Sequence, residues 1–499
     1  MNINNHEIGW NFDNSYLNLP EIFLSKINPV KVSSPELIIF NEKLSNDLNL
    51  DFKSNSNIEI AKIFAGNILP NGSECIAQAY AGHQFGYFTV LGDGRAILLG
   101  EHVNKKNNKF DIQLKGSGKT PYSRNGDGRA ALGPMLREYL ISEAMHGLNI
   151  PTTRALAVVK TGEKVFREKE MDGAILTRIA SSHIRIGTFQ YAAIPRKKDI
   201  LEKLLNYTIK RHHPEILENK GENKAIQIIE KLIEKQISLV VNWMRVGFIQ
   251  GVLNTDNVSL AGETIDYGPC SYMDYYDPKT VFSSIDHQGR YSFNNQEIIT
   301  HWNISRFAET LIPLIDNDED KAIKIGSKII DSFGDKFKSQ WLKMMKNKLG
   351  LINDIPNDEK LIFKFLNWME KNRVDYTNTF LYLMNSQNNN DAHYMSKDFQ
   401  NIYAEWKNRI GKNKCSEKEV IKIMASNNPY YIPRNHIVEK CLYEATINNN
   451  MKEFNSLIQL YKNPYKKLEN HEYYQQPASF EFTEKYKTFC GPQIYLIIN

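Results

Sequence analysis

Four polar residues in one stretch are the strongest candidates for chemistry in this chain. They are Asn254, Asp256, Asn257 and Asp266, in the segment GVLNTDNVSLAGETIDYG (251–268). Asn, Asp and Gly are also the residues that turns prefer, so a plain loop is one interpretation. The other interpretation is a magnesium site, because hard cations bind oxygen ligands.

Lys115 is a second candidate, near the end of the strand-like run KFDIQLKGSG (109–118). Apolar and polar residues alternate in this run, and a period of two places Lys115 on the face opposite the apolar side chains. A helical pattern follows in 133–151 and carries Glu138 and Glu143. In kinase-like folds a helix Glu positions a phosphate-binding strand Lys, so either glutamate is a possible partner. A solvated strand lysine is the simpler alternative.

Two identical G-D-G-R tetrads stand at 92–95 and 126–129. Each is explained equally well by a tight turn or by a phosphate contact. In the second case the glycines let the backbone approach the phosphate, and Arg95 and Arg129 supply positive charge. Two better-known phosphate motifs are excluded. GSGKT (116–120) lacks the first glycine of the Walker pattern, and neither tetrad has the third glycine of a Rossmann fingerprint.

Arg178 and Arg185, seven residues apart in LTRIASSHIRIGTFQ, are a further pair of positive charges. Surface ion pairing is the ordinary role of such residues. Alternatively, they are additional clamps on a polyphosphate, because a guanidinium group binds phosphate oxygens with two parallel hydrogen bonds.

The polar stretch 251–268 also compares with the catalytic loop of protein kinases. That loop ends in Asn, the catalytic Asp lies five residues earlier, and a D-F-G Asp follows on the next strand. Here I-D-Y-G follows Asn257, so Asn257 and Asp266 can hold magnesium. Five residues before Asn257 stands Val252, which cannot accept a proton. The usual base is missing, and an Asp has appeared at 256, beside the metal ligand.

Composition excludes several other classes of function. A net charge of +5 over 499 residues, without a dense Lys/Arg block, does not indicate nucleic-acid binding. The five cysteines are scattered and form no C-x-x-C pair, which argues against a zinc ribbon or a disulfide framework. No apolar run is long enough for a membrane span, and the first residues do not resemble a signal peptide. We therefore expect a cytoplasmic protein without membrane or nucleic-acid partners.

The elements that must position these residues fall into two units. Strand-like runs at 95–103 and 109–118 flank a polar loop and predict a hairpin. Two more strand-like runs follow the helix, and from about residue 190 the pattern becomes helical, with a long amphipathic helix leading into the polar stretch. The sequence predicts an α+β fold, with a strand-rich unit over 1–190 and a helical unit over 191–499.

Several longer motifs resemble the selenoprotein O (YdiU) family, which has a bilobal kinase-like fold. They include AQAYAGHQFGYFTVLGDGRA (77–96), DIQLKGSGKTPYSRNGDGRAALG (111–133), GFIQGVLNTDNVSLAGETIDYGP (247–269) and DHQGRYSF (286–293). The resemblance covers most of the chain and implies a protein adenylyltransferase. It implies that ATP binds flipped relative to kinases, so that AMP passes to Ser, Thr or Tyr hydroxyls of proteins with Mg²⁺ or Mn²⁺. Transfer of UMP from UTP is also implied.

The resemblance assigns roles to single residues. Lys115 matches the phosphate-binding lysine, and Glu138 matches the helix glutamate that pairs with it. Asp256 matches the proton acceptor, while Asn257 and Asp266 match the metal ligands. The nucleotide-binding positions are Gly92, Gly94 and Arg95 in the first tetrad, Asp127 and Gly128 in the second, and Lys115, Arg178, Arg185 and Asp266.

The resemblance also implies a redox-active cysteine near the C-terminus. Cys490 matches one such position, but the place of its bacterial partner is taken by Phe282. Cys270 lies nearby in sequence and is a possible substitute. A free thiol is the expectation in a reducing cytoplasm.

Two other functions remain open at this point. A conventional kinase-type phosphotransferase is disfavoured by Val252 in the position of the base. A catalytically silent nucleotide-binding scaffold is disfavoured because it has no need of Lys115, Glu138, Asn257 and Asp266 together.

Overall fold

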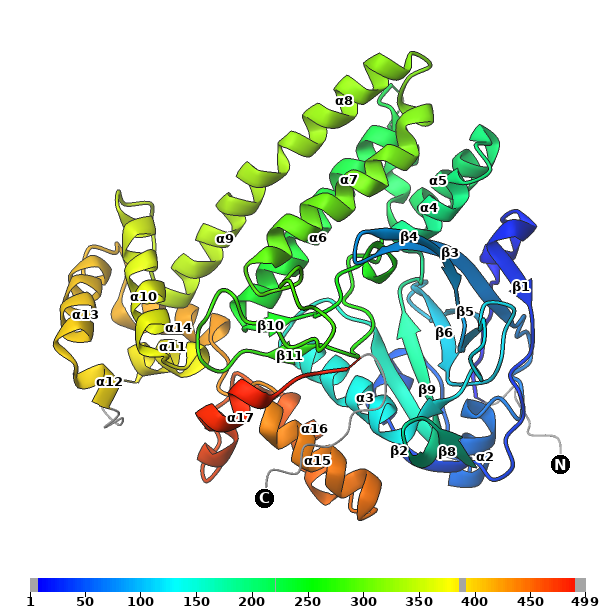
Figure 1. The fold of residues 1–499 in the computed structure, drawn as a ribbon, viewed down its shortest axis with the longest axis horizontal. Helices are drawn as coiled ribbons and strands as arrows, with labels where there is room; N and C mark the ends of the chain where they lie inside the picture. Colours follow the sequence, from blue (N-terminus) through cyan, green and yellow to red (C-terminus); the bar gives the residue numbers. More distant parts are fainter. Residues whose placement is uncertain (1–7, 220, 386–391, 490–499) are drawn as a thin grey trace.

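A strand-rich N-terminal region and a helical C-terminal region make up the fold (Figure 1). The computed structural model describes residues 8–219, 221–385 and 392–489. The α+β class and the order of its two parts are confirmed. The boundary at residue 190 stays a prediction.

One antiparallel sheet dominates the N-terminal region. Its strand order is β1-β3-β5-β6-β9-β8-β2, with β4 paired to β3 and β7 paired to β9. The strands are β1 Leu24–Lys26, β2 Glu36–Phe40, β3 Ile76–Gln84, β4 Tyr87–Gly92, β5 Ala96–Val103, β6 Lys109–Lys115, β7 Ala130–Ala131, β8 Arg154–Phe166 and β9 Glu170–Ala180. The hairpin predicted from 95–103 and 109–118 is confirmed as β5–β6.

Strand β6 shows why alternation matters for the site. Ile112 and Leu114 are fully buried in an apolar cluster on one side of the sheet. Gln113 and Lys115 project from the other side, where both side chains make polar contacts. The period of two in the sequence therefore sets which face of β6 is available for chemistry.

Helix α3 (Leu132–Gly147) packs on β8 and β9, and most of its side chains are buried. It ends at Gly147, four residues before the end of the helical pattern 133–151. A Cβ atom at this position would collide with the backbone carbonyl of Tyr461, so only glycine permits the close approach of the C-terminal helices.

The helices supply the rest of the framework. Asn223 caps helix α6 (Lys224–Arg245), and strand β10 (Phe248–Ile249) follows shortly after its end. Strand β10 pairs with β11 (Ser271–Tyr272), and the two strands enclose the loop 250–270. The helices are α1 Glu42–Asp47, α2 Asn57–Phe64, α4 Ile186–Ala193, α5 Lys198–His212, α6 Lys224–Arg245, α7 Asn295–Ile315, α8 Glu319–Asp331, α9 Phe333–Leu349, α10 Asp358–Asn372, α11 Tyr376–Met384, α12 Ala392–Met395, α13 Lys397–Ile410, α14 Glu417–Asn427, α15 Asn435–Ile447, α16 Lys452–Tyr461 and α17 Phe480–Lys485. Within the described ranges, no helix combines the length and apolarity that crossing a membrane requires.

Candidate active site

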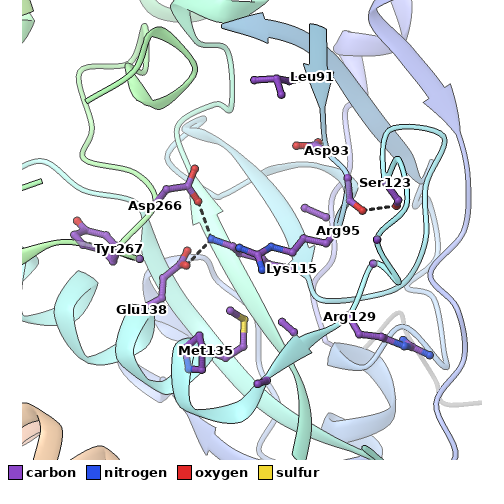
Figure 2. A pocket seen from close by; sticks show the side chains of 18 of the residues that line it. Leu91, Asp93, Arg95, Lys115, Ser123, Arg129, Met135, Glu138, Asp266 and Tyr267 are labelled. Atoms are coloured by element: carbon purple, nitrogen blue, oxygen red, sulfur yellow. Dashed lines mark hydrogen bonds and ion pairs between the residues drawn. The ribbon is translucent and has the colours of Figure 1, made fainter. Parts of the chain in front are cut away.

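A cavity of about 780 Å³ lies between the sheet, α3 and the loop 250–270 (Figure 2). It brings together residues that are far apart in the sequence, from Tyr80 to Phe489. Every predicted site residue except Asp256 lines it. The lining members of the predicted set are Gly92, Gly94, Arg95, Lys115, Asp127, Gly128, Glu138, Arg178, Arg185, Asn257 and Asp266.

Lys115 is the centre of the ionic network in this cavity. Its Nζ atom donates to Oε2 of Glu138 at 2.6 Å and to Oδ1 of Asp266 at 2.7 Å (Figure 2). Glu143 faces elsewhere and accepts two hydrogen bonds of 2.7 Å from Arg154. Of the two glutamates left open by the helical pattern, the structure therefore joins Glu138 to the lysine.

Three cations surround the carboxylate of Asp266. Besides Lys115, Arg178 contacts Oδ1 through Nη1 at 2.7 Å, and Nη1 of Arg185 lies 3.8 Å from Oδ2. Burial alone raises the pKa of a carboxyl group, but the three positive charges outweigh it and hold the pKa of Asp266 well below its ordinary value. Asp266 is therefore ionised and available as an oxygen ligand.

The backbone at Asp266 is also unusual. Its φ angle of +61° lies in the left-handed region, which a residue with a Cβ atom rarely adopts. Such conformations persist only where surrounding contacts impose them, and they cluster at functional sites. Here the ion pairs to Lys115 and Arg178 are contacts of that kind.

Gln113 and Asp93 are site residues that the sequence analysis missed. The side-chain oxygen of Gln113 accepts from Nε and Nη2 of Arg178 at 3.2 and 2.6 Å. The amide nitrogen of Gln113 donates to Oδ2 of Asp93 at 3.2 Å. Burial raises the pKa of Asp93 to about 6. The signal for Gln113 was present, since the alternation that places Lys115 opposite the apolar side chains places Gln113 on the same face as Lys115.

The glycines of the tetrads allow two backbone segments to approach closely. At Gly92, with φ +152°, an added Cβ atom would collide with the ring of Tyr122. At Gly128, with φ +70°, it would collide with the backbone of Gly118. Gly92 therefore lets the segment 116–130 pack against the end of β4, and Gly128 lets that segment fold closely on itself; the segment forms one wall of the cavity.

The charged residues of the tetrads differ in their surroundings. Arg95 is exposed and lines the cavity. Arg129 instead donates to Glu163 at 3.2 Å, and Figure 2 shows its side chain turned away from Lys115. The carboxylate of Asp127 accepts from both terminal nitrogens of Arg167 at 2.7 and 2.9 Å. Arg129 therefore lines the cavity but shares its charge with Glu163, and its contact with a phosphate stays a prediction.

Asp256 departs from the predicted arrangement because it does not line the cavity. It is 7% exposed, and strand β3 covers it: a Cβ atom at Gly82 would collide with Oδ1. Gln84 approaches Oδ2 at 3.5 Å, whereas Oδ1 has no hydrogen-bond partner in the described part of the chain. Burial raises the pKa of Asp256 to about 6.

A hydrogen bond to the backbone holds the side-chain amide nitrogen of Asn257 in place. That nitrogen donates to the backbone oxygen of Val252 at 2.8 Å, which leaves the side-chain oxygen of Asn257 available to a ligand in the cavity. Among the residues described, no cluster of three or more His, Cys, Asp or Glu gathers to hold a metal. Mg²⁺, however, commonly takes one or two protein ligands and completes its coordination with phosphates and water. The oxygens of Asn257 and Asp266 fit that pattern.

The predicted redox pair can be placed only in part. Cys490 lies outside the described residues. Cys270 is a free thiol, and burial raises its pKa to about 12. The backbone oxygen of Phe282 accepts a hydrogen bond of 2.8 Å from the backbone of Thr488, so the chain just before Cys490 does reach position 282.

Comparisons with known proteins point to one family. The profile described as "Protein adenylyltransferase SelO" matches residues 7–462. A "Protein nucleotidyltransferase YdiU" from Pelagibacter ubique is 54% identical over 97% of this chain and 99% of its own length. One of the same name from Anoxybacillus flavithermus is 50% identical over 97% of this chain and 99% of its own. Among solved structures, ROP2 from Toxoplasma gondii, with a protein-kinase fold, matches with a TM-score of 0.26 at 10% identity over 67% of this chain and 86% of ROP2.

Proposed function

The chain belongs to the SelO family and is a protein nucleotidyltransferase, and we propose that it transfers AMP from ATP to hydroxyl groups of Ser, Thr or Tyr in other proteins. The observation that carries this proposal is the convergence of Lys115, Arg178 and Arg185 on Asp266 within one cavity. UTP is the alternative donor.

The charge balance of the cavity suits a triphosphate. Within the ionic network around Lys115, three cations face the two carboxylates of Glu138 and Asp266, which leaves this network with one positive charge in excess before the nucleotide binds. In adenylyl transfer the acceptor oxygen attacks the α-phosphorus, the bond from that phosphorus to the bridging oxygen breaks, and pyrophosphate leaves. Fixed cations are most effective where that negative charge develops, because they need no reorganisation during the reaction.

The position of the carboxylates favours this reaction over phosphoryl transfer. Val252 stands where a kinase has its base, and it lines the cavity without any group that can take a proton. We propose that Asp256 accepts the proton of the attacking hydroxyl. Because Gly82 and Gln84 cover Asp256, the proposal requires that β3 give way at Gln84 when the acceptor binds.

Asn257 and Asp266 are the residues that would hold Mg²⁺ or Mn²⁺. A divalent ion bound there neutralises phosphate oxygens. The chain's own contribution is to keep Asp266 ionised and to hold the amide nitrogen of Asn257 on the backbone of Val252, so that its side-chain oxygen is left for a ligand.

We expect Lys115→Ala to lower turnover about a hundred- to thousandfold, which is the scale of losing one preorganised charged contact. The measurement is the steady-state rate of nucleotide transfer. Lys109→Ala is the matched control, because Lys109 lies on the same strand and pairs with Asp13 outside the cavity. Equal rates for the two variants would mean that Lys115 does not serve the reaction.

The two glutamates of α3 offer a second matched pair. Glu138→Gln is expected to lower turnover about ten- to hundredfold, because it weakens a charge-assisted hydrogen bond to Lys115. Glu143→Gln is expected to leave turnover within about twofold and to lower the melting temperature, since Arg154 loses its carboxylate partner. Parallel rate and melting measurements would contradict this assignment if Glu143→Gln had the larger effect on turnover.

The choice of nucleotide is tested by competition. With equal concentrations of ATP and UTP, we expect intact-mass measurement of a labelled protein acceptor to show mainly AMP added. A predominance of added UMP would overturn the ATP assignment and leave nucleotidyl transfer itself intact.

A further inference from the structure

We propose that the open edge of strand β4 binds the acceptor segment of the protein substrate as an added strand. The inference rests on the proposed function, because it names the surface that receives the protein in that reaction. The segment is extended, carries the hydroxyl, and has an acidic side chain near it.

Strand β4 has one paired edge and one open edge. It pairs with β3 in the register Gln84↔Tyr87 to Ala79↔Gly92, and no second strand pairs with it within the described residues. Its side chains are unusually apolar for such a position: Tyr87 is 79% exposed, Phe88 48% and Val90 54%. Proteins normally protect open edges with charge, proline or a bulge, so a long apolar edge indicates a partner.

The backbone of β4 also has groups available for pairing. A two-residue turn, Phe85 and Gly86, joins β3 to β4, with φ angles of +51° and +90°. In such a hairpin the pair that flanks the turn exchanges two hydrogen bonds, and the pattern then alternates. Phe88 and Val90 therefore direct their N–H and C=O groups to the open edge. An extended segment can use these groups, as in other cases of strand addition.

The hairpin connects this edge to the chemistry. Tyr80 and Gln84 of β3 and Leu91 of β4 line the nucleotide cavity, and Gly82 covers Asp256. Leu91 and Tyr87 pair directly with Tyr80 and Gln84, so these side chains share the face that looks toward the cavity. A strand added to β4 would lie about 4.8 Å beyond it, and alternate side chains would point to that same face. The residue that carries the acceptor hydroxyl has one of the side chains that point to this face.

A cation at the tip of the hairpin favours an acidic side chain in the acceptor. The guanidinium of Arg290 lies 4.9 Å from the ring centroid of Trp302, which in turn contacts His83 of β3. Across the described ranges, Arg290 forms no ion pair with a carboxylate. A negative charge on the bound segment would supply one.

The first test alters the open edge of β4 and leaves the hydrogen bonds between β4 and β3 unchanged. Val90→Pro removes an outward N–H and places a ring on the open edge, whereas Val90→Thr keeps the N–H and the β-branched shape. The probe is a peptide library with a central Ser, Thr or Tyr, labelled from ATP that carries the label on its α-phosphate. We expect kcat/KM for the best-labelled peptide to fall about tenfold in Val90→Pro and to change less than about twofold in Val90→Thr. ATP binding is expected to stay within twofold in both.

The second test uses the wild-type enzyme, so it does not depend on the folding of a variant. The best-labelled peptide is N-methylated at one position at a time. Strand addition predicts that labelling falls at alternate positions and is retained between them, because only every second N–H faces β4. The library is also expected to select Asp or Glu near the hydroxyl, and Arg290→Gln to weaken that selection at least about threefold.

The possible results separate the proposed function from the inference that β4 binds the acceptor segment. If wild-type enzyme labels no peptide from the α-phosphate, the proposed function fails and this inference fails with it. If wild-type enzyme labels peptides but Val90→Pro labels them equally well and N-methylation has no period of two, only the edge-binding inference is overturned.

Discussion

Replacing Asp266 with alanine is expected to lower turnover by about ten-thousandfold while ATP binding in the absence of metal stays at or above the wild-type level. A bound divalent ion contributes several kcal/mol to the transition state, and each 1.36 kcal/mol is a tenfold change in rate. Binding is retained because Lys115 and Arg178 lose a competing carboxylate and remain able to contact phosphate. Rates and ATP affinity are measured on the same preparation.

A folding defect must be separated from a catalytic one in this experiment. Removing Asp266 leaves buried cations without a partner, and breaking a buried pair in this way typically costs about 3–5 kcal/mol of stability. Thermal unfolding therefore accompanies the rate measurement, and Asp266→Asn serves as a second variant that preserves shape. Turnover within tenfold of wild type in a folded Asp266→Ala protein would mean that the metal site lies elsewhere.

Replacing Asp256 with asparagine is expected to lower turnover about a hundred- to ten-thousandfold, the range for loss of a general base. Asparagine has nearly the same shape and keeps an oxygen for Gln84, so the covering by β3 should persist. The contact from Arg185 is made to the backbone oxygen of Asp256 and does not depend on the side chain. The nucleotide site itself should therefore remain as it is.

The test of Asp256 measures kcat and the affinity for ATP separately. We expect kcat to fall while the affinity for ATP changes less than about threefold. If instead the affinity for ATP falls and kcat does not, the Asp256 side chain supports the nucleotide site without taking the proton, and the proton acceptor must be sought among the residues that line the cavity.

The sequence allowed the strand side of the site to be predicted well. Alternation in β6 places Lys115 opposite the buried Ile112 and Leu114, and the structure confirms that placement. The same alternation would have found Gln113. Local periodicity is enough here because a strand has only two faces and one of them is buried.

Positions that depend on tertiary packing were not accessible in the same way. Glu138 and Glu143 are five residues apart, so they lie about 140° apart around α3, and only the docking of α3 on the sheet decides which one meets Lys115. The hairpin β3–β4 was not recognised from its own residues because Phe85 is an unusual residue at a turn position with positive φ. Without that hairpin, the covering of Asp256 by Gly82 could not be foreseen.

The polar stretch 251–268 contains one predicted site residue that lines the cavity, Asp266, and one that does not, Asp256. Asp266 lines the cavity and is kept ionised by its three cationic neighbours, which a metal ligand requires, and its role as a ligand stays a prediction. Asp256 has the residue type of a base but lies under β3 rather than in the cavity. Residue type and spacing identify the loop, whereas access to the cavity is a property of the folded chain.

The most direct test of adenylyl transfer is a comparison of labels. Purified protein is incubated with Mg²⁺, a protein acceptor and ATP labelled at either the α- or the γ-phosphate, and acid-stable label on protein is counted. The expected result is label from the α position alone, because pyrophosphate carries the γ-phosphate away. Label from the γ position would contradict the proposal, identify phosphoryl transfer, and require a base other than the one that Val252 replaces.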